Sequence, residues 1–242
     1  LVLRRQRQMC IRDRNMYDGS GEFSPVPGVG LSLRKITKEA SLKIAKSAFE
    51  IAKSRSVNKS IKSKVHVVHK ANVMKITDGI FLDACRHISS KYNDVDYDEM
   101  LVDACAAHLV RKPDQFDVIV TTNMFGDILS DLATELSGSL GLAGSLNAGK
   151  NHAMAQAQHG AAPDIADQNI ANPISLILSS AMLLDWLGKN REIDKLILAS
   201  NLINDSVLEL LKDRENFTRD LGGNASTGKI TENLIKILNK II

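Results

Sequence analysis

The sequence predicts an α/β protein in which parallel strands are joined by helical crossovers. Short β-branched or alternating stretches take turns with longer stretches whose apolar residues recur every three to four positions. Aliphatic residues dominate over aromatic residues, which make up only 4% of the chain, and this suits helices packed on a sheet better than an all-β fold. A chain of 242 residues can bury a sizeable core as one large or two smaller domains.

The elements follow in order from these patterns. Residues 15–34 are rich in Gly, Ser and Pro and predict strands and turns. Helices are expected at residues 37–56, 77–92, 103–110, 123–140, 173–188, 192–212 and 231–242, and strands at 64–70, 100–103 and 116–120. Glycines after residue 138 loosen the chain, so we expect a central dimerisation and substrate subdomain at 15–138 and a C-terminal part of a larger cofactor-binding subdomain at 139–242.

Positive charge is concentrated at the N-terminus. The formal net charge is +3, but residues 1–14 contain five arginines and one aspartate, so the remaining 228 residues carry about −1. The body of the chain therefore gives no support for nucleic-acid binding. Residues 8–14 look like an in-frame translation of an adapter used in sequencing-library preparation. We expect residues 1–14 to be a non-native scar or a disordered tail, with a basic targeting presequence as the alternative.

Cysteine content and hydropathy point to a soluble protein of the reducing cytoplasm. The three cysteines, Cys10, Cys85 and Cys105, have no C-x-x-C spacing, which favours neither a disulfide framework nor a zinc cluster. The longest apolar run, residues 174–187, contains Asp185 and is too short to span a bilayer. We expect no membrane association.

The first candidate site is the stretch Thr-Thr-Asn-Met-Phe-Gly-Asp-Ile-Leu-Ser-Asp at residues 121–131, where a strand gives way to a helix. Asp127 and Asp131 are four residues apart, which places both carboxylates on one helix face. Like charges in this arrangement repel unless a cation lies between them, and either a hard divalent ion or a Lys or Arg side chain can fill that role. An exposed acidic helix start is the other interpretation, because Asp also suits the helix dipole there.

Two further patterns are weaker. Residues 223–229 match the phosphate-binding pattern G-x-x-x-x-G-K, but Ile230 follows where a Ser or Thr is needed and no buried strand precedes, so a Gly-rich turn before the last helix is favoured. His66 and His69 fall on opposite faces of their strand, which argues against a paired metal site.

Five separated stretches carry a family resemblance. They are His-Lys-Ala-Asn-Val-Met at 69–74, Val-Asp at 102–103, residues 123–131, His-Gly-Ala-Ala-Pro-Asp-Ile-Ala at 159–166, and Ala-Asn-Pro at 171–173. In these stretches and their order the chain resembles the isocitrate and isopropylmalate dehydrogenases, the metal-dependent β-decarboxylating dehydrogenases of 2-hydroxy acids. The resemblance covers nearly all of the chain from Asn15 to the C-terminus. It implies an isopropylmalate dehydrogenase-like α/β fold with two subdomains, incomplete at the N-terminus.

The resemblance also implies a Mg or Mn site and two proton-transfer groups. Asp127 and Asp131 look like the metal ligands of one subunit, and Asp103 looks like the ligand that the neighbouring subunit donates. Lys70 resembles the lysine that assists deprotonation of the substrate hydroxyl across the dimer interface, and Tyr17 the tyrosine that reprotonates the enolate. These roles imply a homodimer with shared active sites.

The cofactor residues are assigned by the same resemblance. They comprise the loop expected to bind the adenosine, a residue expected to meet the adenine, and the first residue of the 123–131 motif: His159, Gly160, Ala161, Ala162 and Asp164, then Asn172, then Asn123. A carboxylate at Asp164 accepts hydrogen bonds from a ribose 2′-hydroxyl and repels a 2′-phosphate, so NAD is favoured over NADP.

The chain also departs from the family pattern. The arginines that clamp the substrate carboxylates and the first Gly-rich loop are absent, and Asp167 stands where a glycine is common. We therefore expect a truncated NAD- and metal-dependent oxidative decarboxylase of a small 2-hydroxy acid of the isopropylmalate, isocitrate or tartrate type, with weak or no turnover by this chain. The alternatives are a non-catalytic regulatory subunit of the same fold and a phosphate-loop nucleotide-binding protein.

Overall fold

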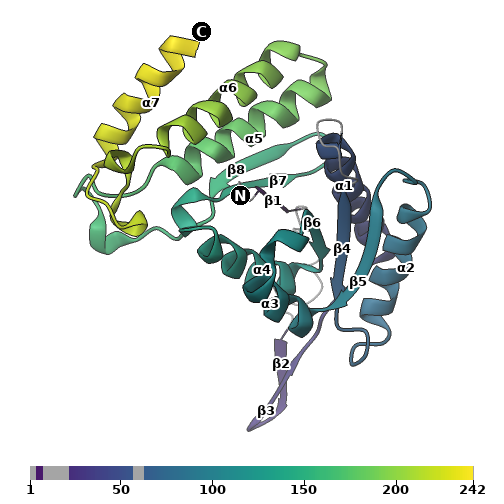
Figure 1. Ribbon diagram of the computed structural model, residues 1–242. Coiled ribbons are helices and arrows are strands. Elements are labelled where there is room, and N and C mark those ends of the chain that lie inside the picture. Colours follow the sequence, from purple (N-terminus) through teal and green to yellow (C-terminus); the bar gives the residue numbers. More distant parts are fainter. Residues whose placement is uncertain (1–3, 8–21, 57–62, 242) are drawn as a thin grey trace. The chain divides into compact units, whose positions relative to one another are not determined.

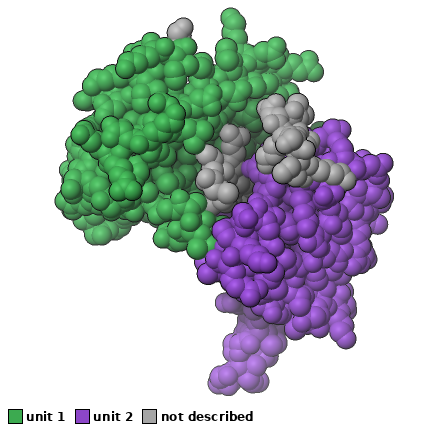
Figure 2. Space-filling model, viewed as in Figure 1, with its two compact units in different colours: residues 1–7, 133–242 green, residues 8–132 purple. Residues whose placement is uncertain are grey.

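The computed structural model describes residues 4–7, 22–56 and 63–241, which form two compact units (Figure 2). Unit 2 comprises residues 8–132, and unit 1 comprises residues 1–7 and 133–242. The division falls inside helix α4 (Asn123–Leu136), whereas the sequence placed a boundary after residue 138. Tyr17 lies outside the described residues.

Unit 2 is built on a three-stranded parallel sheet with the strand order β5-β4-β6 (Figure 1). Val65 of the central strand pairs with Tyr97 on one side and with Val118 on the other. Parallel neighbours require crossover connections, and helices supply them. The elements are β4 (Lys64–His69), β5 (Asp96–Leu101), β6 (Val118–Thr121), α1 (Lys38–Ser56), α2 (Thr77–Ser89), α3 (Val102–Arg111) and α4. The predicted α/β class is confirmed.

The core of unit 2 lies between the sheet and helices α1 and α2. Phe49 of α1 and Phe81 of α2 pack with Val65 and Val67 of β4, and all four side chains are buried. Alternate residues point to the opposite face, where the His66 ring lies 4.7 Å from the ring of Phe116 between centroids. Because β4 is covered on both faces, its three valines are fully buried, and His66 and His69 are buried with them.

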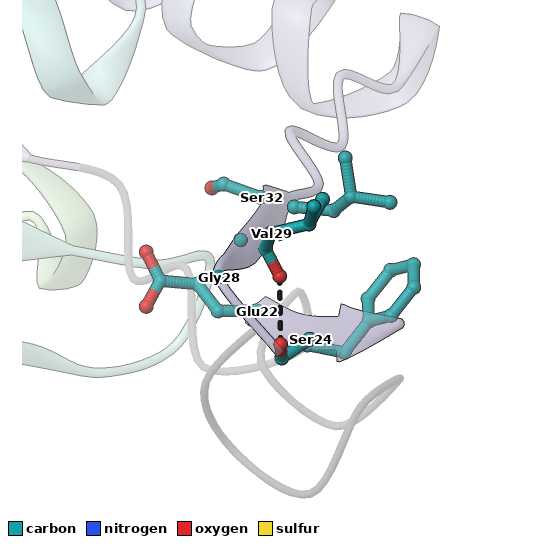
Figure 3. Close-up of a pocket in the computed structure, with 8 residues that line it drawn as sticks. Glu22, Ser24, Gly28, Val29 and Ser32 are labelled. Carbon is teal, nitrogen blue, oxygen red and sulfur yellow. Dashed lines mark hydrogen bonds between the residues drawn. The ribbon is translucent and has the colours of Figure 1, made fainter. Parts of the chain in front are cut away.

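Strands β2 (Glu22–Val26) and β3 (Val29–Ser32) form an antiparallel hairpin within the region predicted to hold strands and turns. Gly28 has a φ of 82°, the left-handed conformation that the second central position of a type II turn requires. The Ser24 hydroxyl donates to the Val29 carbonyl at 2.7 Å, and the hairpin residues drawn in Figure 3 line a shallow depression. Every hairpin residue is exposed, and two strands without further cover are at best marginally stable in water.

Unit 1 is a three-stranded sheet with stacked helices. Strand β7 pairs with β1 in parallel and with β8 antiparallel; Arg4–Arg7, which was not expected to belong to the fold, forms β1. Helix α5 packs on β7 and β8, α6 packs on α5, and α7 packs on α6 (Figure 1). The remaining elements are β7 (Gly144–Ala148), β8 (Ala153–Ala157), α5 (Ile174–Arg191), α6 (Asp194–Leu210) and α7 (Thr227–Ile241). Across the described ranges, no helix combines the length and apolar character needed to cross a membrane.

Strand β7 occupies a stretch that the glycine content predicts to be loose. All five of its residues are buried, although the sequence is only Gly-Ser-Leu-Asn-Ala. A Cβ on Gly144 would lie 3.0 Å from the Met182 sulfur and 3.1 Å from the Leu178 backbone carbon. The glycine therefore marks a close approach between α5 and the strand, and not a hinge.

Buried serines of α5 tie this helix to both strands. The Ser145 amide of β7 donates to the Ser179 hydroxyl at 2.9 Å, and that hydroxyl lies 2.8 Å from the Gln156 carbonyl of β8. The Ser175 hydroxyl donates to the Ala143 carbonyl at 2.6 Å. These hydroxyls satisfy backbone groups that would otherwise be buried without a partner.

We predict that Ser179→Ala lowers the free energy of unfolding by about 1–3 kcal/mol, because the Ser145 amide loses its acceptor inside the core. Urea unfolding followed by circular dichroism measures this change. Ser180→Ala is the matched control, since the exposed Ser180 hydroxyl only bonds the Leu176 carbonyl of its own helix. Equal effects of the two substitutions would show that the Ser179 bonds add nothing to stability.

His66 is a buried titratable group in the unit 2 core. Its side chain is 1% exposed, and its Nδ1 has no hydrogen-bond partner among the described residues. Its Nε2 lies 3.8 Å from the nearest carboxylate oxygen of Asp98. Burial, assisted by the Lys64 ammonium, holds the pKa of His66 below its ordinary value of 6.5.

Because the folded protein resists protonation of His66, the unfolded chain binds a proton more readily once the pH falls below about 6.5. We predict that the free energy of unfolding decreases between about pH 7 and pH 5, and that His66→Leu reduces this decrease. Urea unfolding at several pH values tests the prediction. His152→Leu, at an exposed position, is the control and should leave the pH dependence of the free energy of unfolding unchanged. An unchanged pH dependence in His66→Leu would contradict the prediction.

Candidate active-site residues

The predicted site residues of unit 2 gather at the carboxyl edge of its parallel sheet. Lys70 follows the last residue of β4, and Asp103 lies in the first turn of α3, directly after β5. Helix α4, with Asp127 and Asp131, follows β6. In a parallel sheet all strands end at one edge, so residues from distant parts of the chain meet there.

Lys70 and Asp103 are in direct contact. The Lys70 Nζ donates to Asp103 Oδ1 at 2.6 Å, with the two side chains 26% and 64% exposed. The hydrogen bond from the Lys70 ammonium holds the pKa of the Asp103 carboxyl below its ordinary value. The structure thus brings together, within one chain, two residues that the resemblance assigned to the neighbouring subunit's site.

Asp127 and Asp131 lie one turn apart on α4, as their spacing predicts. Asp127 is half-buried and Asp131 is exposed, and Asn123 is exposed at the start of the same helix. In the part of the chain that the structure describes, no three His, Cys, Asp or Glu side chains come together as a metal cluster, so Asp103 does not join this pair within one chain. Two carboxylates on adjacent turns fit Mg or Mn, which would take its other oxygen ligands from elsewhere.

The predicted cofactor loop belongs to unit 1 and begins after β8. His159, Gly160 and Ala161 are exposed, and His159 Nδ1 lies 2.9 Å from the Gly160 carbonyl oxygen. Asp164 is exposed in a short 3-10 turn, Pro163–Ile165. The carboxylate is therefore open to solvent, where a ribose hydroxyl can reach it.

Three residues of this loop that are not glycine have left-handed backbones. The φ values are 44° at Ala162, 61° at Asp167 and 56° at Asn169. The conformation costs roughly 1–2 kcal/mol at a residue with a side chain and is least costly for Asn and Asp. A glycine would adopt the backbone conformation of Asp167 without this cost.

Asn172 is held by Asp220, which sequence reasoning missed. The Asn172 Nδ2 donates to Asp220 Oδ2 at 3.0 Å, and its Oδ1 accepts the Ile174 amide at 3.0 Å at the start of α5. The Ser139 hydroxyl donates to the same Asp220 oxygen at 2.5 Å. A Cβ on Gly141 would lie 2.5 Å from that oxygen and 2.7 Å from Asn172 Nδ2, so only glycine leaves this arrangement intact.

Residues 223–229 do not have the geometry of a phosphate loop. A Cβ on Gly223 would lie 2.0 Å from the Phe217 carbonyl oxygen, so close packing explains this glycine. The Lys229 Nζ lies 3.7 Å from Glu215 Oε2, and within the described residues no strand lies between β8 and α7. The structure gives the phosphate-loop alternative no support.

Comparison with known proteins identifies the family of the chain. The model of the isocitrate/isopropylmalate dehydrogenase family matches residues 11–235. A mitochondrial regulatory subunit of the NAD isocitrate dehydrogenase of Dictyostelium discoideum is 43% identical over 94% of this chain and 62% of its own length. The 3-isopropylmalate dehydrogenase of Sulfurisphaera tokodaii is 44% identical over 88% of this chain and 60% of its own length.

A solved structure gives the same result for the fold. The crystal structure of isocitrate dehydrogenase from Methylococcus capsulatus superposes with a TM-score of 0.76 and 40% identity, over 87% of this chain and 59% of that one. The chain belongs to the isocitrate/isopropylmalate dehydrogenase family. It spans about 60% of the length of the relatives that it matches. The family consists of β-decarboxylating dehydrogenases and includes subunits named as regulatory.

Proposed function

We propose that this chain is part of an NAD- and divalent-metal-dependent dehydrogenase that oxidises and decarboxylates a 2-hydroxy acid of the isopropylmalate, isocitrate or tartrate type. The observation that carries the proposal is the 2.6 Å contact between the Lys70 amine and the Asp103 carboxylate. These residues come from separate sequence motifs, and the resemblance assigns both to the same chemistry independently of their contact. The parallel sheet supplies the physical reason for their meeting.

Each charged residue has a defined task in this chemistry. A bound Mg or Mn ion would lower the energy of negative charge on the substrate oxygen, and Asp127 and Asp131 would hold it. The Lys70 amine, positioned by Asp103, would accept the proton of the substrate hydroxyl after it has released its own proton to solvent, and NAD, when bound, would take the hydride. After carbon dioxide leaves, Tyr17 returns a proton to the carbon that carried the carboxylate.

The cofactor is assigned to the loop after β8. The exposed Asp164 carboxylate can accept hydrogen bonds from a ribose 2′-hydroxyl and repels a 2′-phosphate, which supports NAD over NADP. His159, Gly160, Ala161 and Ala162 would line the adenosine, and the side chain of Asn172 is already oriented by Asp220. We place Asn123 beside the cofactor as well.

A regulatory role is the second candidate function. The observation that favours it is the 43% identity to a relative named as a regulatory subunit. The catalytic assignment is favoured by the presence of all four charged candidates, Lys70, Asp103, Asp127 and Asp131. A subunit with a purely regulatory role would not require the complete set. Metal binding by the α4 carboxylates distinguishes the two candidates.

We place the protein in a reducing compartment, the cytoplasm being the simplest choice. Cys85 and Cys105 are free and buried in the described structure. The Dictyostelium relative is named as mitochondrial.

We predict that Asp127→Asn raises the dissociation constant for Mn²⁺ by more than the roughly 10–100-fold that follows loss of an outer-shell partner, because a charged ligand is removed. Electron paramagnetic resonance of free Mn²⁺ measures the binding, and circular dichroism confirms that the fold is intact. Glu135→Gln, an exposed carboxylate on the same helix, is the control and should bind as the natural sequence does. Unchanged Mn²⁺ affinity in Asp127→Asn would return the pair to an ordinary acidic helix start.

We further propose that the chain forms a homodimer with shared active sites. The hairpin supports this, because Phe23 and Leu31 face each other across its strands and remain 48% and 46% exposed. On α4, Met124 and Ile128 are 53% and 61% exposed beside the metal-binding candidates. Apolar side chains grouped in this way commonly mark contacts with another chain.

We predict that the double substitution Phe23→Ser with Leu31→Ser converts dimers into monomers at micromolar concentration, because it removes the cross-strand apolar pair of the hairpin. Sedimentation velocity measures the change. Leu198→Ser on α6, at a position that is 59% exposed, is the control and should leave the dimer intact. A natural chain that sediments as a monomer would contradict the proposal.

A further inference from the structure

Asp78 of α2 is a fully buried carboxylate beside the candidate site, and the proposed chemistry gives it no role. Its side chain is 0% exposed. Its Oδ1 accepts from the Arg34 guanidinium at 2.6 Å, and its Oδ2 accepts the backbone amide of Lys70 at 2.6 Å. Both bonds have the short length typical of charge-assisted hydrogen bonds.

The Asp78 carboxylate satisfies a backbone amide, that of Lys70, which has no partner in the described sheet. Strand β4 ends at His69, which is the last residue paired with β5, so the Lys70 amide lies beyond the ladder. The Lys70 carbonyl accepts the amides of Val73 at 3.0 Å and Met74 at 2.8 Å. With Asp78 as acceptor on the other side, the backbone of Lys70 is fixed at both ends, which limits the positions that its amine can reach.

Arg34 connects Asp78 to the start of α4. Its Nη2 donates to the Thr122 hydroxyl at 2.5 Å, and its guanidinium carbon lies 5.2 Å from the ring centroid of Phe125. Its Nη1 lies 2.9 Å from the Met74 sulfur. A planar group with several donors can make these contacts at once, whereas the single ammonium of a lysine cannot.

We propose that Arg34 and Asp78 are positioning residues for the function proposed above, on which this inference rests. Asp78 fixes Lys70 so that its amine meets Asp103, and Arg34 fixes the first turn of α4 so that Asp127 and Asp131 face the same edge of the sheet. Neither residue touches the reacting atoms. A pair with a purely structural role would stabilise unit 2 without controlling the environment of the Lys70 amine.

The test reads the Lys70 amine directly and needs no metal or substrate. Reductive ¹³C-methylation of the lysines gives each amine an NMR signal; loss of one signal in Lys70→Arg identifies Lys70, and Asp103→Asn shows where that signal lies when the ion pair is broken. We expect Asp78→Asn to move the Lys70 signal at least half of the way to its position in Asp103→Asn. We expect Arg34→Lys to move it in the same direction by a smaller amount.

The control is a second partly buried Arg–Asp pair of unit 2, in which Arg55 Nη1 lies 3.1 Å from Asp117 Oδ1. Asp117→Asn should destabilise the unit and leave the Lys70 signal in place. A folded Asp78→Asn protein with an unchanged Lys70 signal would overturn the proposal, as would an equal shift in Asp117→Asn. If Asp78→Asn does not fold, Arg34→Lys decides by the same criteria, because it keeps the charge.

Mn²⁺ binding tests the α4 half of the proposal. Arg34→Lys should raise the dissociation constant roughly ten-fold, the usual effect of losing an outer-shell partner, while Asp117→Asn leaves it unchanged. Unchanged affinity in Arg34→Lys overturns the role of Arg34 at α4. If the natural chain binds no Mn²⁺, the proposed function fails, and the Lys70 signal alone decides whether Asp78 positions the amine.

Discussion

The carboxylate of Asp78 is the constraint on which the carboxyl edge of the unit 2 sheet depends. A charge with no solvent exposure costs several kcal/mol unless it is paired and hydrogen-bonded. Arg34 and the Lys70 amide satisfy it, and each brings its own segment of chain to the same point. Replacement of such a pair by apolar residues often stabilises a protein, so its value here lies less in stability than in specifying one arrangement of these segments.

In unit 1, buried polar groups are also satisfied by side chains, in this case hydroxyl groups and one carboxylate. The serines of α5 satisfy backbone groups near the ends of β7 and β8, and Asp220 holds Asn172 beside Gly141. In both units, polar side chains that are distant in sequence fix the loops that follow strands. The candidate binding residues lie in those loops or in the helices that follow them, so their positions are determined by contacts that are made before any ligand arrives.

The helices of this protein are predictable because periodicity is a local signal. Helix α1 at Lys38–Ser56 agrees with the expected 37–56. Strand β7 was missed, because its small residues carry no strand signal. From the sequence Gly144 indicates a flexible position, and only its close contact with α5 explains the glycine. The resemblance singled out Lys70 and Asp103, which the structure brings into contact, and their roles stay predictions. No local sequence pattern indicated a role for Arg34, Asp78 or Asp220, because each acts through contacts with residues that are distant in sequence. Tyr17 lies outside the described residues, so its role stays a prediction.

The central position of β4 has a consequence for how the chain reaches its native state. Val65 pairs with Tyr97 and with Val118, and both partners lie far along the chain. The sheet around β4 therefore cannot form until these distant segments have come together. Non-local pairing of this kind is slow, and a valine-rich run that is exposed in the meantime can pair with other molecules. Lys64 and Lys70 flank the run, and their like charges oppose stacking of one chain on another. The lysine proposed for proton transfer would thus also protect the unfinished sheet from aggregation.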